Sequence, residues 1–208
     1  MISLPTPLHR GVGAREDPMK KALALLFLVM TTAHVHGEYK EALALFEKGQ
    51  YDLSLKKIGA ELNAANDLAP ESPNYNLRYL AAHNYWKLGN YKAAATHLWR
   101  CAVIKKDQVS PYIDLTMLYL DEKKLIEAET IAWNGMKLGK SAILYYCLGV
   151  ISMKKNNYIK AKEYFEQANA IQPDLYYSYN ALGMSLIFLK KYGEANTAFS
   201  AALALNPG

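Results

Sequence analysis

Cysteine is scarce in this sequence, which has only Cys101 and Cys147 among its 208 residues. Two cysteines cannot support the disulfide-dense scaffold of small secreted domains. They also lie in non-adjacent copies of an internal repeat, so we expect packed thiols; a disulfide or a reactive pair is the alternative. Histidine is also scarce, and no two histidines have the i, i+4 spacing of a zinc site on a helix. The sequence therefore predicts no metal site and no cofactor.

Motifs that carry chemistry are missing as well. The sequence has no Gly-rich phosphate-binding loop, no nucleophile elbow and no outstanding pair of carboxylates. The acidic residues within 121–129 fit solvated helix and turn positions. The net charge of +5 is small, and no basic stripe with interleaved aromatics follows one helix face. We therefore predict a non-enzymatic protein that binds neither nucleic acid nor a small-molecule substrate.

No apolar run near the amino terminus is long enough to span a bilayer, which takes about 20 residues. The stretch Ala22–Ala33 is shorter, follows a lysine pair and ends in small residues, as is typical of a secretory signal peptide. We expect a signal that begins at Met19, after a mis-called start, and is cleaved after Ala33 or Gly37. The lysine pair suggests a bacterial product, either periplasmic or secreted. An uncleaved anchor in the inner membrane and an amphipathic helix are the alternatives.

An internal repeat is the main feature that is present. When the sequence is shifted by 34 residues, the segment that begins at Ala142 matches the segment that begins at Tyr176. The matching pairs are Tyr145 and Tyr179, Leu148 and Leu182, Gly149 and Gly183, Ala161 and Ala195, Phe165 and Phe199, Ala168 and Ala202, and Pro173 and Pro207. A fixed period of this size indicates a solenoid built from one repeated supersecondary unit.

Each copy is expected to fold as two short helices joined by a polar turn. In the first copy the turn is 155–157, and Pro173 ends the second helix because proline cannot continue it. Gly149 in mid-helix would cost about 1 kcal/mol relative to alanine. We expect close packing of the two helices around Phe165 to offset that cost. One pair cannot bury its apolar stripe alone, so neighbouring pairs must stack.

The order of residue types resembles the tetratricopeptide repeat: an aromatic residue, Leu-Gly after two positions, then alanine, phenylalanine and a closing proline. The resemblance implies an all-α, right-handed superhelical solenoid of antiparallel helix pairs. Residues 1–37 would precede this solenoid, which spans 38–208. About five repeats are expected, at residues 35–68, 75–108, 109–141, 142–175 and 176–208.

In the family that this chain resembles, the first helix of each repeat lines a concave groove for extended or helical peptides. The repeat register then implies a partner-binding groove formed by Tyr79, His83, Trp86, Ile113, Asp114, Met117, Asp121, Tyr146, Val150, Met153, Tyr177, Asn180 and Met184. Aromatic and methionine side chains suit an apolar or adaptable ligand. The alternative is that they pack against neighbouring first helices. The Lys, Asn and Arg clamp by which some members hold chaperone tails is absent.

Two further features have open interpretations. Trp99 and Trp133 recur 34 residues apart on second helices, where they form either an outer aromatic strip or packing between repeats. The given sequence has no further helix to cover Phe199 and Leu203. That edge is either tolerated or docks on another copy or a partner.

These patterns lead to one functional hypothesis and two alternatives. We predict an exported protein-interaction scaffold or adaptor that binds a peptide or helix of another protein, in the bacterial envelope. One alternative is a structural subunit that self-associates into a homo-oligomer through its C-terminal repeat. The other is an accessory subunit of a secretion or cell-wall complex.

Overall fold

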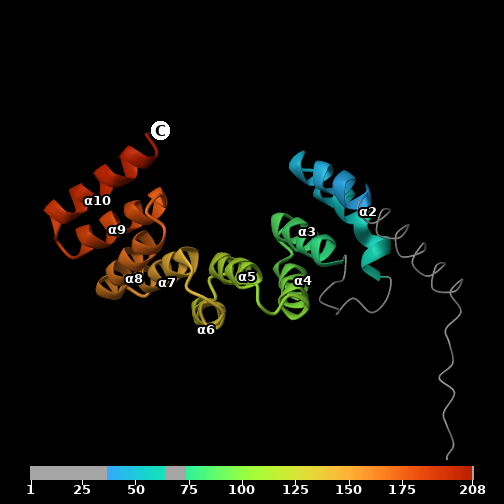
Figure 1. Cartoon of the computed structure of the whole chain (residues 1–208), viewed down its shortest axis with the longest axis horizontal. Coiled ribbons are helices and arrows are strands. Elements are labelled where there is room, and N and C mark those ends of the chain that lie inside the picture. Colours follow the sequence, from blue (N-terminus) through green and yellow to red (C-terminus); the bar gives the residue numbers. More distant parts are fainter. Residues whose placement is uncertain (1–36, 64–73, 208) are drawn as a thin grey trace, which may run out of the picture.

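The structure is a computed structural model that describes residues 37–63 and 74–207 (Figure 1). These residues form helices and no strand. Residues 37–47 are helical. The later helices are α2 (Tyr51–Asn63), α3 (Asn74–Lys87), α4 (Tyr91–Ile104), α5 (Ser110–Asp121), α6 (Leu125–Met136), α7 (Ala142–Lys154), α8 (Tyr158–Ile171), α9 (Tyr176–Phe188) and α10 (Tyr192–Leu205).

The helices pack as consecutive pairs that stack into an open arc. Helix α3 pairs with α4, α5 with α6, α7 with α8, and α9 with α10. Each pair also contacts the next, and α7 contacts both α5 and α9. In Figure 1, α3, α5 and α7 lie toward the inside of the arc, while α4 and α6 lie outside. The prediction of an all-α repeat solenoid is confirmed.

One turn design closes each described helix pair. The turn residue adopts a left-handed backbone in every case, with φ between 59° and 75°, which ends a helix by satisfying its last carbonyl groups. These residues are Gly49, Gly89, Lys123, Asn156 and Lys190. In two turns an asparagine follows and caps the next helix: Asn90 Oδ1 accepts from the Ala93 amide at 3.1 Å, and Asn157 Oδ1 accepts from the Lys160 amide at 3.2 Å.

Glycines set the closest approach between the two helices of a repeat. A Cβ atom on Gly149 would lie 2.5 Å from the Phe165 ring, and one on Gly183 would lie 2.6 Å from the Phe199 ring. Since real Cβ atoms do not approach this closely, only glycine lets the phenylalanine ring lie this close to the first helix of its repeat. The packing expected for Gly149 is confirmed.

Buried polar contacts join the helix at residues 37–47 to α2, and α2 to α3. Ser54 Oγ of α2 donates to the Ala42 carbonyl oxygen at 2.8 Å. Asn84 Nδ2 of α3 donates to Ser54 Oγ at 3.0 Å and to the Leu80 carbonyl oxygen at 2.9 Å. Buried polar groups of this kind need such partners, so the contacts fix how α2 and α3 are stacked.

Both cysteines are free and buried, so the expectation of packed thiols is confirmed. Burial raises the pKa of each thiol to about 12. The expected signal peptide, at 19–33 or 19–37, lies outside the described residues, apart from Gly37. Within the described ranges, the helices are too short or too polar to cross a membrane.

Candidate partner-binding groove

An aromatic stripe runs along the inner face of α3. Tyr75, Tyr79, His83 and Trp86 share this face because they are spaced by three or four residues, close to the helical repeat. Their rings contact in series, with centroids 5.8 Å apart for Tyr75 and Tyr79, 4.8 Å for Tyr79 and His83, and 6.0 Å for His83 and Trp86. The stripe is therefore a continuous aromatic surface.

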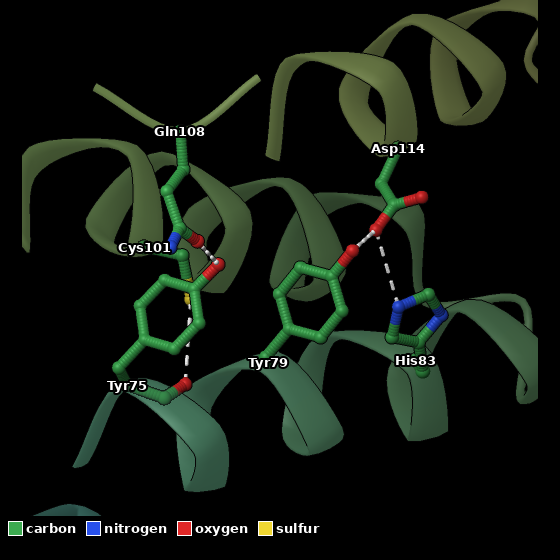
Figure 2. A network of polar contacts seen from close by, with 6 residues as sticks. All are labelled: Tyr75, Tyr79, His83, Cys101, Gln108 and Asp114. Carbon is green, nitrogen blue, oxygen red and sulfur yellow. Dashed lines mark hydrogen bonds and ion pairs between the residues drawn. The ribbon is translucent and has the colours of Figure 1, made fainter. Parts of the chain in front are cut away.

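Two carboxylates of α5 hold this stripe in place. The Tyr79 hydroxyl donates to Asp114 Oδ2, which also lies 3.2 Å from His83 Nε2 (Figure 2). Trp86 Nε1 donates to Asp121 Oδ2 at 2.9 Å. Asp114 and Asp121 are two helical turns apart, as are Tyr79 and Trp86, so adjacent first helices meet in register.

The buried end of the stripe is neutral and fully protonated at physiological pH. Burial raises the pKa of Tyr79 well above its usual range, and the Asp114 carboxylate adds to the effect. Burial raises the pKa of Tyr75 to about 12, with Cys101 and Asp114 adding to it. Figure 2 shows the Tyr75 hydroxyl directed toward Gln108, to whose Oε1 it donates at 3.0 Å.

The other end of the stripe opens into a pocket of about 350 Å³ between α3 and α5. It is lined by His83, Trp86, Lys87, Tyr91 and Asp121. Three of these were predicted groove residues, and Lys87 and Tyr91 were not. The pocket places an indole, an imidazole and a carboxylate around one hollow. Such a hollow can receive one side chain of a bound segment.

The predicted groove residues of α7 and α9 pack partly against each other. The ring centroids of Tyr146 and Tyr177 lie 4.7 Å apart in an edge-to-face arrangement, and that of Tyr146 lies 5.8 Å from Phe165. Burial raises the pKa of both tyrosines. Val150 and Met153 are half-buried on the same helix. This part of the surface joins first helices as well as facing the inside of the arc.

The remaining predicted groove residues differ in exposure. Met117 is 38% exposed and Met184 is 46% exposed, so both offer flexible apolar surface. Ile113 is half-buried and packs against the cluster of Ala132, Leu144 and Leu148. Asn180 lines a separate pocket with Phe199 and Leu203, at the last helix pair.

Tyr75 was missed in the sequence, although it lies one turn before Tyr79 and extends the same stripe. The helical spacing was the available signal. Tyr91 is the first residue of α4, and nothing in the spacing of the first helices points to it.

Trp99 and Trp133 both pack between repeats and form part of the outer surface. The ring centroid of Trp99 lies 6.2 Å from that of Tyr112 in α5, and that of Trp133 lies 6.2 Å from that of Tyr164 in α8. Both tryptophans remain partly exposed. They therefore pack between consecutive repeats and leave one side of the ring in solvent.

No three metal-ligating side chains converge in the part of the chain that the structure describes. The site therefore consists of aromatic, apolar and acidic surface along the first helices.

Two segments match family models described as tetratricopeptide repeat, at residues 142–175 and 176–208. These segments comprise α7 with α8 and α9 with α10. No curated protein matches the sequence significantly.

Solved structures share the fold at low sequence identity. BtubC (BKLC) from P. vanneervenii is 18% identical, with a TM-score of 0.74 over 90% of this chain and 85% of that one. TTC0263, a thermophilic TPR protein of Thermus thermophilus, is 18% identical, with a TM-score of 0.63 over 83% of this chain and 92% of that one. MamA from Desulfovibrio magneticus RS-1 is 16% identical, with a TM-score of 0.66 over 83% of this chain and 95% of that one.

The chain is an all-α solenoid of stacked helix pairs with aromatic surface along its first helices. This architecture places it in the class of helical repeat proteins. The last two helix pairs of this solenoid are tetratricopeptide repeats. The curvature of such solenoids creates an extended surface for binding other proteins.

Proposed function

We propose that the inner face of the solenoid binds an extended or helical segment of another protein, and that the chain acts as a non-enzymatic scaffold. The observation that carries the proposal is the aromatic stripe of α3, which the carboxylates of α5 fix beside an open pocket. Aromatic side chains in well-packed pockets account for most of the binding energy at many interfaces. Here the rings are already ordered, so less conformational entropy is lost on binding.

Trp86 is the residue on which this proposal depends most. It lines the pocket, and its indole nitrogen is held by Asp121 at 2.9 Å. A partner side chain that enters the pocket must contact this ring. Removing a central aromatic anchor typically weakens binding by about 2 kcal/mol or more, which is roughly thirtyfold.

The chain offers a matched control in Trp133. This tryptophan packs edge-to-face on one neighbouring tyrosine, and it lies on α6, a second helix outside the arc. We expect Trp86→Ala to abolish capture of a cellular partner by the full chain, whereas Trp133→Ala retains it. Both variants should first show unaltered helix content by circular dichroism. If the two variants retain or lose the same partner equally, the inner face is not the binding surface.

We further propose that this binding takes place in a bacterial envelope, after export. The support is the sequence of Ala22–Ala33, with its preceding lysine pair and its small-residue end. The intact mass of the protein from its native cells tests this. A mass that corresponds to cleavage after Ala33 or Gly37 supports export, and a mass that retains the apolar stretch contradicts cleavage.

A further inference from the structure

A pocket with a basic lining lies between α2, α3 and α4, and it shares no residue with the pocket beside Trp86. Its volume is about 310 Å³. Three of its lining side chains are apolar or aromatic, and three are basic. These six are Leu55, Leu62, Tyr85, Arg78, His97 and Arg100. No carboxylate is among the described residues that line this pocket.

The basic side chains are held in the pocket by the helices that carry them. Arg78 of α3 is only 5% exposed, and its Nη2 donates to the Leu62 carbonyl oxygen at 3.2 Å. The His97 ring of α4 stacks on the Tyr85 ring, with centroids 5.4 Å apart and planes 15° apart. Arg100 follows His97 by three residues, so both lie on one face of α4, and Arg100 is exposed at the rim. One guanidinium is thus buried, and the other borders solvent.

The two arginine charges act on each other and on the imidazole. Burial lowers the pKa of Arg78, and the charge of Arg100 lowers it further. Burial lowers the pKa of His97 to about 4, and Arg78 and Arg100 add to the effect. At neutral pH the pocket therefore presents two positive charges and a neutral imidazole. An anion that contacts both arginines reduces the repulsion between them, and partial burial strengthens its attraction to each.

We infer that this pocket binds the oxyanion group of a small ligand, a phosphate or a carboxylate. The planar guanidinium group presents its N–H donors in a fork that matches the oxygen atoms of either group. Arg78 binds the anion from the buried side, and Arg100 binds it from the rim. The pocket is at the small end of the range for ligand sites, about 300–1,000 Å³, so the ligand is small. Leu55, Leu62 and Tyr85 contact its apolar part.

Titration of the full chain with sodium phosphate, and separately with sodium succinate, tests the inference by calorimetry at constant ionic strength. We expect at least one of the two anions to bind saturably, with one site per chain. Arg100→Gln should weaken this binding about tenfold or more, because a hydrogen-bonded charge is lost. Lys160→Gln is the matched control, since it removes the same charge from an exposed position on α8 and should leave binding unaltered. Absence of binding by both anions, or equal affinity in the two variants, would overturn the inference.

A second measurement needs no variant that alters the pocket. The anion that binds should shift the NMR signals of the His97 imidazole and leave those of His83, which lines the other pocket, in place. Equal shifts of both histidines, or of neither, contradict binding between α2, α3 and α4.

The sequence also carries Asp67 and Glu71, which lie outside the described residues. Their carboxylates are the competing source of an oxyanion. If phosphate and succinate bind only after Asp67→Asn and Glu71→Gln, the chain supplies its own occupant and the inference is overturned. Because Trp86→Ala should leave anion binding unchanged, this site is tested independently of the groove.

Discussion

Replacing Gly149 by alanine should destabilise the solenoid, although alanine is the better helix former. The added methyl group would lie 2.5 Å from the Phe165 ring, which is fully buried and cannot move aside. Overpacking of this kind costs about 1–3 kcal/mol, and the gain in helix propensity returns about 1 kcal/mol. We expect a net loss of up to about 2 kcal/mol in the free energy of unfolding, or a melting temperature lower by up to about 8 °C.

The matched control is Gly193→Ala in α10, where nothing lies within 4 Å of the added Cβ atom. This variant should gain stability, by up to about 1 kcal/mol. Both variants are compared with the parent by urea unfolding followed by circular dichroism. If Gly149→Ala is as stable as Gly193→Ala, glycine is not required at the crossing of α7 and α8. The explanation for the Leu-Gly motif would then be wrong.

Three further predictions concern a turn, a buried histidine and the thiols. Lys190 has a left-handed backbone with φ of 60°, so Lys190→Gly should raise stability by about 0.5–1 kcal/mol in thermal melts, whereas no gain would exclude strain there. Burial lowers the pKa of His97 to about 4, and the nearby Arg78 and Arg100 add to the effect. The unfolded chain therefore binds more protons between about pH 6.5 and 4, so stability falls as the pH is lowered through that window, and His97→Gln should make this decrease shallower in unfolding titrations. If His97→Gln leaves the pH dependence of the unfolding free energy unaltered, His97 is not the group that causes the decrease. Since both thiols are buried with pKa values of about 12, neither Cys101 nor Cys147 should react with Ellman's reagent at pH 8 until urea unfolds the chain.

The fold could be predicted because the same pattern of packing residues occurs twice in the sequence. Gly149 and Gly183 recur with Phe165 and Phe199, and in each case the glycine lies against the ring of its own repeat. The helical periodicity and the fixed spacing of the repeat are properties of the sequence itself, so they can be recognised without the tertiary structure.

The candidate site was harder to predict because contacts between helices depend on register between repeats. The sequence placed Tyr79 and Asp114 on first helices, but not the hydrogen bond between them, which spans 35 residues. Tyr91 reaches its pocket from the start of a second helix, and Asn180 lies at the end of the array. Side-chain direction across an interface is set by packing, and no periodicity in the sequence reports it.

Site-specific photo-crosslinking tests the central claim most directly. A benzoylphenylalanine at Met117, which lies on α5 between Asp114 and Asp121, is compared with one at Ile126 of α6, which is 74% exposed. If the inner face binds a partner, a crosslinked product should form from Met117 and not from Ile126. Equal products from both positions, or a product from Ile126 alone, would contradict binding in the groove.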